Sequence, residues 1–225
     1  MAANRRVSVI VPALNESARI GALVASLRAG GFDEVIVADG GSDDDTAALA
    51  MHAGALLARA PRGRGLQMHA GAGHARGEVL FFLHADSDVP PGARAAILAA
   101  LERPGVVAGS FALAFDERHW FLDALAGLSR INHALTTYGD QGLFMARDVY
   151  DAIGGFKPMP ILEDLEIQHR LRRRGRFIKL RQCLRTSARR FLQDGIVRRQ
   201  CANVAIVACY LAGESPEELA RRYRY

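Results

Sequence analysis

Short apolar runs alternate with amphipathic segments over the first half of the chain, and this alternation limits the possible folds more than any other feature. Residues 7–11, 35–38, 55–58 and 79–83 have the composition of buried strands. The segments between them have helical patterns, with apolar side chains at i, i+3, i+4 and i+7 over residues 20–27. Alanine-rich residues 46–53 and residues 66–75 continue the series. This order predicts an α/β fold with a doubly wound, mostly parallel sheet flanked by helices.

The second half of the chain is less regular. Its strand-like runs are residues 106–115, 142–146 and 177–184, and its helical patterns are residues 120–135, 162–174 and 196–212. No repeat or linker separates the two halves. A chain of 225 residues is long enough to bury a substantial core as one large domain.

Polar residues follow three of the expected strands. Asn15 and Glu16 come after the first, Asp39 ends the second, and Asp86 and Asp88 follow the fourth. Ligands of open α/β sheets bind at the carboxyl ends of the strands, so these side chains should converge on one crevice. There they either coordinate a cation or accept hydrogen bonds from sugar hydroxyls and base N–H groups. Turn and cap preferences explain one such strand end about equally well, and Asn15 is also expected to cap the following helix, but they do not explain three together.

Several other site classes lack their sequence patterns. No GxGxxG follows the first strand, and GxxxxGK[ST], GxSxG and HExxH are absent. The three cysteines form no CxxC pair, which predicts buried thiols in a reducing compartment. No apolar run approaches the roughly 20 residues of a membrane span. The residues before the first strand leave no room for a signal peptide, so we expect a cytoplasmic protein.

The basic residues are mostly arginines late in the chain. Lysine and arginine number 29 against 24 acidic residues, and only two of the 29 are lysines. Arginine suits bidentate phosphate binding, although a high-GC genome produces the same bias. The arginine runs have no aromatic residues between them, and no nucleic-acid-binding motif is present. We therefore expect no nucleic-acid partner.

Four segments, taken in order, resemble the family 2 glycosyltransferases with a GT-A fold. They are VSVIVPALNE at residues 7–16, VADGGSDDDT at 37–46, the DxD motif at 86–88 and the acidic doublet at 163–164. The resemblance extends over about residues 7–180. The segment GDQGLFM at 139–145, followed by ILEDLE, further resembles a small bacterial subgroup associated with radical-SAM and arsenosugar gene clusters.

The resemblance implies a fold, an activity and a cofactor. It implies a single GT-A domain over residues 1–225, with a nucleotide-binding half to about residue 105, an acceptor and catalytic half to about 195, and a C-terminal helix and tail. The activity would be inverting transfer of a sugar from a nucleotide-diphosphate sugar, with a UDP-sugar expected, to an acceptor hydroxyl of unknown identity. The alternative is a nucleotidyltransferase on a related sheet. That class requires a glycine-rich basic segment where this chain has Asn15 and Glu16.

The resemblance also implies which residues bind the donor. Asp39 would accept a hydrogen bond from the base, and Asp86 would contact the ribose. Asp88 would hold Mg²⁺ or Mn²⁺ between the two phosphates, because a hard cation bound by carboxylate offsets the charge of a pyrophosphate leaving group. The remaining donor residues would line the base and ribose or contact the phosphates: Pro12, Asn15, Glu16, Arg64, Arg189 and Arg190. For the last two, a solvated basic face is an equally good interpretation.

Asp164 is the candidate catalytic base. It lies in the first turn of the helix expected over residues 162–174, where the helix dipole favours an ionised carboxylate. Such a group can take a proton from an acceptor hydroxyl, whereas the alternative is the ordinary enrichment of acids at helix starts. On resemblance, the acceptor pocket would include Asp140, Gln141 and Glu163.

The helix expected over residues 196–212 carries an apolar stripe. Its members recur every three or four residues: Val197, Cys201, Val204, Ala208 and Leu211. Core packing is the common explanation, but a lid, a homodimer contact or a membrane surface would also cover it, and flanking arginines permit contact with anionic lipid. No QxxRW segment follows the acidic doublet. We therefore expect single transfer rather than processive synthesis, in the cytoplasm or peripherally at the inner face of the membrane.

Overall fold

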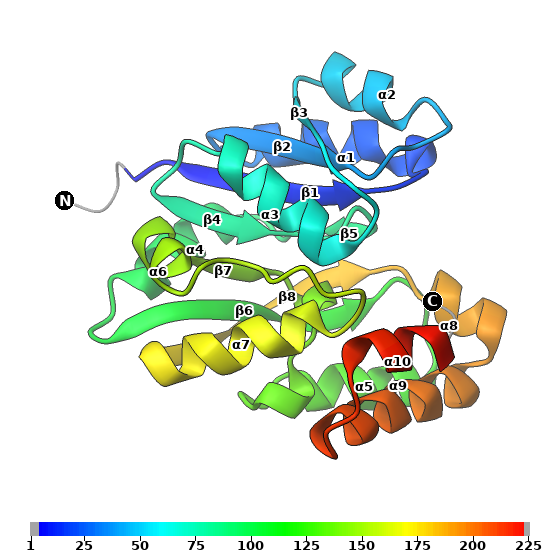
Figure 1. Ribbon diagram of the computed structural model, residues 1–225. Helices are drawn as coiled ribbons and strands as arrows, with labels where there is room; N and C mark the ends of the chain where they lie inside the picture. Colours follow the sequence, from blue (N-terminus) through cyan, green and yellow to red (C-terminus); the bar gives the residue numbers. More distant parts are fainter. Residues whose placement is uncertain (1–4, 223–225) are drawn as a thin grey trace.

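The computed structural model describes residues 5–222 and contains one sheet of eight strands in the order β3-β2-β1-β4-β7-β6-β8-β5 (Figure 1). The strands are β1 Val7–Ala13, β2 Glu34–Asp39, β3 Leu56–Arg59, β4 Val79–Phe82, β5 Ser87–Asp88, β6 Val106–Phe115, β7 Leu143–Ala146 and β8 Arg176–Thr186. The helices are α1 Ser17–Ala29, α2 Thr46–His52, α3 Arg64–His74, α4 Ala93–Leu101, α5 Trp120–Leu128, α6 Arg147–Ala152, α7 Glu163–Arg174, α8 Arg189–Asp194, α9 Ile196–Leu211 and α10 Pro216–Arg222.

The first half has the doubly wound arrangement that the sequence predicts. Strands β3, β2, β1 and β4 are all parallel, and every residue of β1 is buried. Helices α1, α2 and α4 contribute to the hydrophobic core on one face, whereas α3, α6 and α7 contribute to the core on the other. The chain moves outward from β1 to β3 and then returns to place β4 on the other side of β1. This reversal creates a switch point beside the carboxyl end of β1, where ligands of such sheets bind.

The second half makes the sheet mixed. Strand β7 is antiparallel to both β4 and β6, and β8 is parallel to β6. Strands β6 and β8 therefore run in the same direction as β1 and β4, so all four carboxyl ends lie along one edge. The last two residues of the DxD segment form β5, which pairs antiparallel with the end of β8. This pairing was not predicted, because two residues carry no strand pattern.

Helices α5, α8, α9 and α10 gather beyond the β6–β8 part of the sheet (Figure 1). A small hydrophobic cluster of Ile161, Ile206 and Leu219 joins α9 and α10 to the segment before α7. The predicted stripe of α9 does not join this cluster, and all five of its members are exposed. Core packing is therefore the wrong explanation for that stripe. No helix within residues 5–222 is long and apolar enough to cross a membrane.

Three local expectations were wrong. The helix expected over residues 120–135 ends at Leu128, because the Ser129 hydroxyl donates to the Ala126 carbonyl (2.7 Å) and accepts from the Leu113 amide (2.8 Å), which ties the chain to β6. Asn15 does not cap α1: it has a left-handed backbone (φ 55°), and Glu16 occupies the cap position without a side-chain bond. The cysteines are not buried, since Cys201 is exposed and the other two are half-buried.

Candidate active site

A cavity of about 250 Å³ opens at the sheet edge where β4, β6 and β8 end. Side chains from α3, α5, α7, α8 and α9 complete its wall. Six of the residues predicted from the sequence border it: Arg64, Asp86, Asp140, Gln141, Asp164 and Arg190. The structure thus brings residues that lie more than 100 positions apart into one space.

Asp164 is held by two backbone amides at the start of α7. Its Oδ2 accepts from the Gly139 amide (2.7 Å) and its Oδ1 from the Leu165 amide (2.8 Å). Leu162, immediately before the helix, has φ 63°. Leucine rarely adopts this left-handed conformation, and such strain is concentrated at functional sites. The backbone therefore fixes the orientation of the carboxylate against the cavity.

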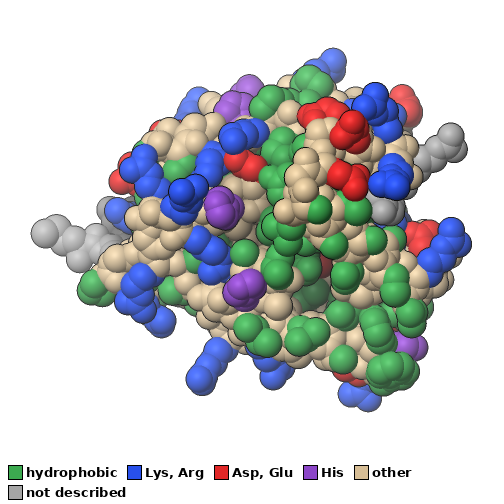
Figure 2. Space-filling model, turned by 60° about the horizontal axis from the view of Figure 1, so that its bottom comes forward, with side chains coloured by type: hydrophobic (Ala, Val, Ile, Leu, Met, Phe, Trp, Pro, Cys, Tyr) green, Lys and Arg blue, Asp and Glu red, His purple; other side chains and the backbone are tan. Residues whose placement is uncertain are grey.

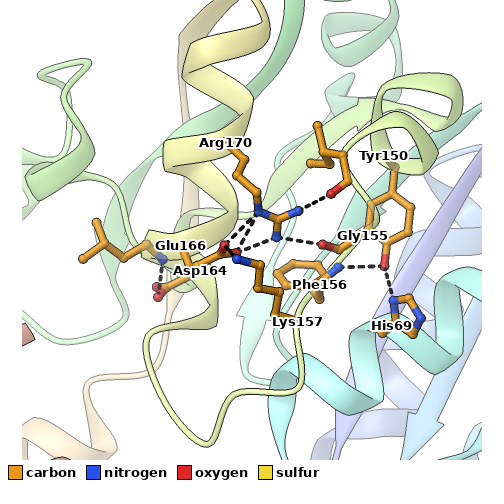
Figure 3. Close-up of polar contacts among 10 residues, drawn as sticks. His69, Tyr150, Gly155, Phe156, Lys157, Asp164, Glu166 and Arg170 are labelled. Carbon is orange, nitrogen blue, oxygen red and sulfur yellow. Dashed lines mark hydrogen bonds and ion pairs between the residues drawn. The ribbon is translucent and has the colours of Figure 1, made fainter. Parts of the chain in front are cut away.

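An ion-pair network stabilises the first turns of α7 on the side of the helix that faces away from Asp164. Glu166 projects to the opposite side of the helix from Asp164, toward Lys157 and Arg170 (Figure 3), which it contacts at 2.6 and 2.5 Å. Arg170 also donates to the carbonyls of Ile153 (2.5 Å) and Gly155 (2.7 Å). Sequence reasoning missed this network, although the i, i+4 spacing of Glu166 and Arg170 is a readable signal.

Asp140 is half-buried at the cavity, and its Oδ1, which is inaccessible to solvent, has no hydrogen-bond partner within residues 5–222. Burial raises the pKa of Asp140 to about 7, and the nearby carboxylates of Asp164 and Asp86 contribute to the increase. Burial lowers the pKa of Lys179, behind it, to about 7. The Lys179 Nζ donates to the hydroxyls of Ser110 (2.8 Å) and Thr137 (2.9 Å).

Gln141 and Glu163 are already engaged by the protein. The Gln141 amide nitrogen donates to the Thr136 carbonyl (2.9 Å), and its oxygen accepts from Lys179. Glu163 is 3% exposed, pairs with Arg64 Nε at 3.0 Å and does not line the cavity. Burial raises the pKa of Glu163, and the Arg64 charge opposes that increase. Both residues hold the walls of the site, and neither presents a free polar group to it.

His84 is a further residue at the site, beside the DxD segment in the sequence. It lines the cavity, and burial lowers its pKa to about 3, assisted by the Arg64 charge, so the imidazole is neutral. A Cβ atom at Gly139 would lie 2.9 Å from His84 Nε2 and 3.5 Å from Asp164 Oδ2. Only glycine therefore lets this loop approach both side chains.

Hydrogen bonds join the loops that follow β1 and β2. The Asn15 amide donates to the Ser42 hydroxyl (3.0 Å), and the Asn15 side chain accepts from the Asp43 amide (2.9 Å). Asp39 is 7% exposed and accepts from the Ser42 hydroxyl at 2.5 Å. Pro12 is buried within β1. These residues form one polar rim at the switch point.

Gln67 of α3 is a positioning residue that the sequence reasoning missed. Its amide nitrogen donates to the carbonyls of Ala13 (2.7 Å) and Ala38 (2.9 Å), at the ends of β1 and β2. It is 4% exposed, and a Cβ atom at Gly40 would lie 3.0 Å from its amide. A buried glutamine between two strand ends has no distinctive sequence signal.

Asp86 borders both the cavity and a second hollow, which lies against α1 and includes Asp88. Asp88 is exposed and does not line the first cavity. Two contacts cross from the start of α1 to the segment after β8: Glu16 to Arg189 at 3.8 Å, and Arg19 to Ser187 at 3.5 Å. Burial raises the pKa of Glu16, and Arg189 opposes that increase.

The carboxylates of the DxD segment are the ligand type that hard divalent cations prefer. Within residues 5–222, however, no three His, Cys, Asp or Glu side chains converge closely enough to enclose an ion. Asp88 could therefore supply part of the ligand set of such a cation, but the described residues do not supply a complete set.

Comparison with known proteins decides between the glycosyltransferase and nucleotidyltransferase interpretations of this site. The family model described as "Glycosyl transferase family 2" matches residues 8–160, more than half of the chain. The chain belongs to glycosyltransferase family 2. This membership confirms the resemblance that the four motifs indicated.

Two curated relatives of this family 2 glycosyltransferase match over part of its length. Glucosyl-3-phosphoglycerate synthase of Mycolicibacterium smegmatis is 45% identical over 58 residues, which are 24% of this chain and 19% of the relative. An uncharacterized glycosyltransferase of Mycobacterium tuberculosis is 34% identical over 98 residues, which are 43% of this chain and 44% of the relative. The matches thus span less than half of either relative.

Solved structures show the same fold. Glucosyl-3-phosphoglycerate synthase of M. tuberculosis superposes with a TM-score of 0.60 at 24% identity, covering 80% of this chain and 72% of that one. A complex of that synthase with Mn²⁺, UDP-glucose and glycerol 3-phosphate has a TM-score of 0.57 at 24% identity, with 80% and 71% covered. The fold of this family 2 enzyme is therefore GT-A, as predicted.

Proposed function

We propose that this enzyme transfers a sugar, with inversion, from a nucleotide-diphosphate sugar to an acceptor hydroxyl, using Mg²⁺ or Mn²⁺. UDP-sugars are the proposed donor class. Solved structures of the synthase with the same fold contain Mn²⁺ and UDP or UDP-glucose. Membership of the subgroup associated with radical-SAM and arsenosugar clusters is part of the proposal, and it rests on the segments at residues 139–145 and 161–166.

The placement of Asp164 is the observation that carries this proposal. Its carboxylate lines the cavity at the same sheet edge as Asp86, and the backbone fixes its direction. In a single displacement, the acceptor oxygen bonds to the anomeric carbon while the bond from that carbon to the diphosphate oxygen breaks. Asp164 takes the acceptor's proton as its hydroxyl becomes acidic, late in bond formation.

The donor would lie across the DxD segment. Asp86 would contact the ribose, and Asp88 would hold the divalent cation, whose charge offsets the negative charge that gathers on the leaving diphosphate. The rim residues Pro12, Asn15 and Asp39, together with Glu16, would bind the nucleoside, and the phosphates would contact Arg64, Arg189 and Arg190. Asp140 would contact the acceptor, whereas Gln141 and Glu163 would support it through Lys179 and Arg64.

The proposal also divides the chain by task. Residues 1 to about 105 would bind the donor, residues to about 195 would carry the base and acceptor pocket, and the remainder would form the C-terminal helix and tail. The exposed stripe of α9, with the exposed Arg198 beside it, would contact an anionic membrane surface or a second copy of the chain.

The test compares donor binding with turnover in Asp164→Asn. UDP should bind the variant and the wild type with equal affinity in the presence of Mn²⁺, since the diphosphate is held elsewhere. Release of UDP from UDP-glucose should fall by about 10²–10⁴-fold, the usual contribution of a general base. Asp123→Asn is the matched control, because Asp123 is an exposed residue of α5. Near-normal turnover in Asp164→Asn would exclude Asp164 as the base. Formation of pyrophosphate from UTP and a sugar 1-phosphate, without release of UDP from UDP-glucose, would support a nucleotidyltransferase.

A further inference from the structure

We propose that the acceptor is an alcohol with a hydrocarbon portion, whose hydroxyl lies at Asp164 and whose apolar part fills the rest of the cavity. This inference rests on the proposed transfer reaction and assigns its second substrate a chemical class. It depends on how the wall of the cavity changes from one end to the other.

The cavity is charged at one end and apolar at the other. Its charged end holds Asp164, Asp140, Asp86, Arg64 and Arg190. Its other end lies between β6 and helices α5, α8 and α9, where the wall includes the apolar side chains of Leu113, Phe115, Leu125, Leu128, Phe191 and Val207. A ligand that spans the cavity must therefore be amphiphilic.

The polar groups at the apolar end do not change this conclusion. Ser129 uses its hydroxyl within the protein, accepting from the Leu113 amide and donating to the Ala126 carbonyl. Gln200 and Asn203 interrupt the wall on α9. Arg199, also on α9, forms an ion pair with Asp194 at 2.9 Å. This end thus has no built anion site that would hold a second phosphate or carboxylate.

Apolar side chains at the mouth remain exposed to solvent. Leu128 is 51% exposed and Leu135 is 41% exposed, although both line the cavity. Figure 2 turns the lower side of Figure 1 forward and shows hydrophobic side chains gathered around a hollow on this face. Covering them with a hydrocarbon chain removes apolar surface from water, and this favours binding. Large exposed apolar areas beside a pocket are typical of binding surfaces.

The charged end can orient the hydroxyl. Asp164 presents a fixed carboxylate, and Asp140 contributes to the same part of the cavity wall. An acceptor hydroxyl placed there donates its hydrogen bond to one of the two carboxyl groups. The structural relative of the same fold has instead been solved with the anionic ligands glycerol 3-phosphate and phosphoglyceric acid. The apolar wall predicts a different acceptor class for this chain.

The test titrates linear 1-alkanols, from butanol to octanol, into the full chain saturated with UDP and Mn²⁺. The dissociation constant should fall about fourfold per added methylene, until the apolar end is filled. Leu128→Gln should flatten this dependence, and Phe191→Asn is a second variant with the same expectation. Val204→Gln is the matched control, because Val204 is 55% exposed on α9 and does not line the cavity. Melting temperatures establish that each variant is folded.

A second arm separates the two sources of such an alcohol. Transfer to a long-chain alcohol carried in phosphatidylcholine vesicles identifies a membrane lipid, whereas transfer to dissolved alkanols alone identifies a free metabolite. Affinity that does not depend on chain length overturns the proposal, as does tight binding of 3-phosphoglycerate that Leu128→Gln leaves unchanged. Failure of the transfer reaction itself is seen separately, as loss of UDP binding or of UDP release from UDP-glucose.

Discussion

At the scale of single residues, three of the aspartates at the site lie in three different environments. Asp88 is exposed on β5, Asp164 accepts two backbone hydrogen bonds, and Asp140 is half-buried with an unpartnered, inaccessible oxygen. The same carboxyl group can therefore bind a cation, accept a proton or remain protonated, depending on its surroundings. Each environment leads to a different expectation for replacement by asparagine.

Asp88→Asn should weaken the binding of UDP in the presence of Mn²⁺. The amide has no charge and is a weaker ligand for a hard cation, so the metal no longer strengthens the interaction with the diphosphate. Calorimetric titration of UDP with and without Mn²⁺ measures the effect. The increase in affinity that Mn²⁺ provides should shrink by at least about tenfold. Equal affinity in the two proteins would eliminate Asp88 as a metal ligand.

Asp140→Asn should stabilise the protein above neutral pH. Burial raises the pKa of Asp140 to about 7, so the folded state keeps a proton that the unfolded chain loses near pH 4. The wild type therefore loses stability as the pH rises through this window, and above pH 7 the folded state must bury a charge. We expect the variant to gain on the order of 2 kcal/mol in unfolding free energy at pH 8, and almost nothing at pH 4.

Urea unfolding at the two pH values measures this difference, with Asp123→Asn as the exposed control. The sign is decisive, because an ordinary ion pair between Asp140 and Lys179 would make the variant less stable at pH 8. That outcome would show that the carboxyl group is charged and compensated in the folded protein.

At the scale of elements, α3 lies unusually close to the sheet and brings Arg64 and Gln67 to the site. A Cβ atom at Gly71 would lie 2.5 Å from the Ile10 side chain, whereas at Gly73, two residues later, no atom lies within 4 Å. Gly71 therefore sets the distance between α3 and β1. Any outward shift of the helix would move Gln67 away from the strand-end carbonyls that it bonds.

The two glycines of α3 form a matched pair of test positions. Gly71→Ala should destabilise the protein by about 1–3 kcal/mol through overpacking and should weaken UDP binding. Gly73→Ala should stabilise it by about 0.5 kcal/mol, because alanine restricts the unfolded chain and favours the helix. Urea unfolding of both variants checks the contrast. Equal effects at the two positions would mean that the close approach of α3 has no energetic consequence.

At the scale of the whole molecule, the sequence predicted the parts that depend on local patterns. Continuous apolar runs identified β1, β2 and β4 because both faces of these strands are buried, and the polar residues after them marked the sheet edge. Asp164 was singled out by the acidic doublet of the family resemblance and by its position at a helix start. Arg64, Asp86, Asp140 and Arg190 do meet it at one cavity.

Features that depend on tertiary pairing were not predictable. Strand β5 exists only because Ser87 and Asp88 meet the end of β8, and α5 stops at Leu128 because Ser129 bonds to β6. The apolar stripe of α9 indicated burial, yet the opposite side of the helix lines the cavity. Sequence periodicity indicates that a helix has an apolar face, but it does not indicate what that face packs against.

The stereochemistry of donor cleavage tests the central claim most directly, and it needs no knowledge of the acceptor. When water replaces the acceptor, the wild type with Mn²⁺ should release glucose slowly from UDP-glucose, whose sugar is α-linked. A single displacement at the anomeric carbon, with Asp164 as base, yields the β anomer first, and early ¹H NMR spectra resolve it before mutarotation. β-Glucose as the first product is the result we predict. α-Glucose as the first product would contradict the inverting mechanism and the role of Asp164 in it.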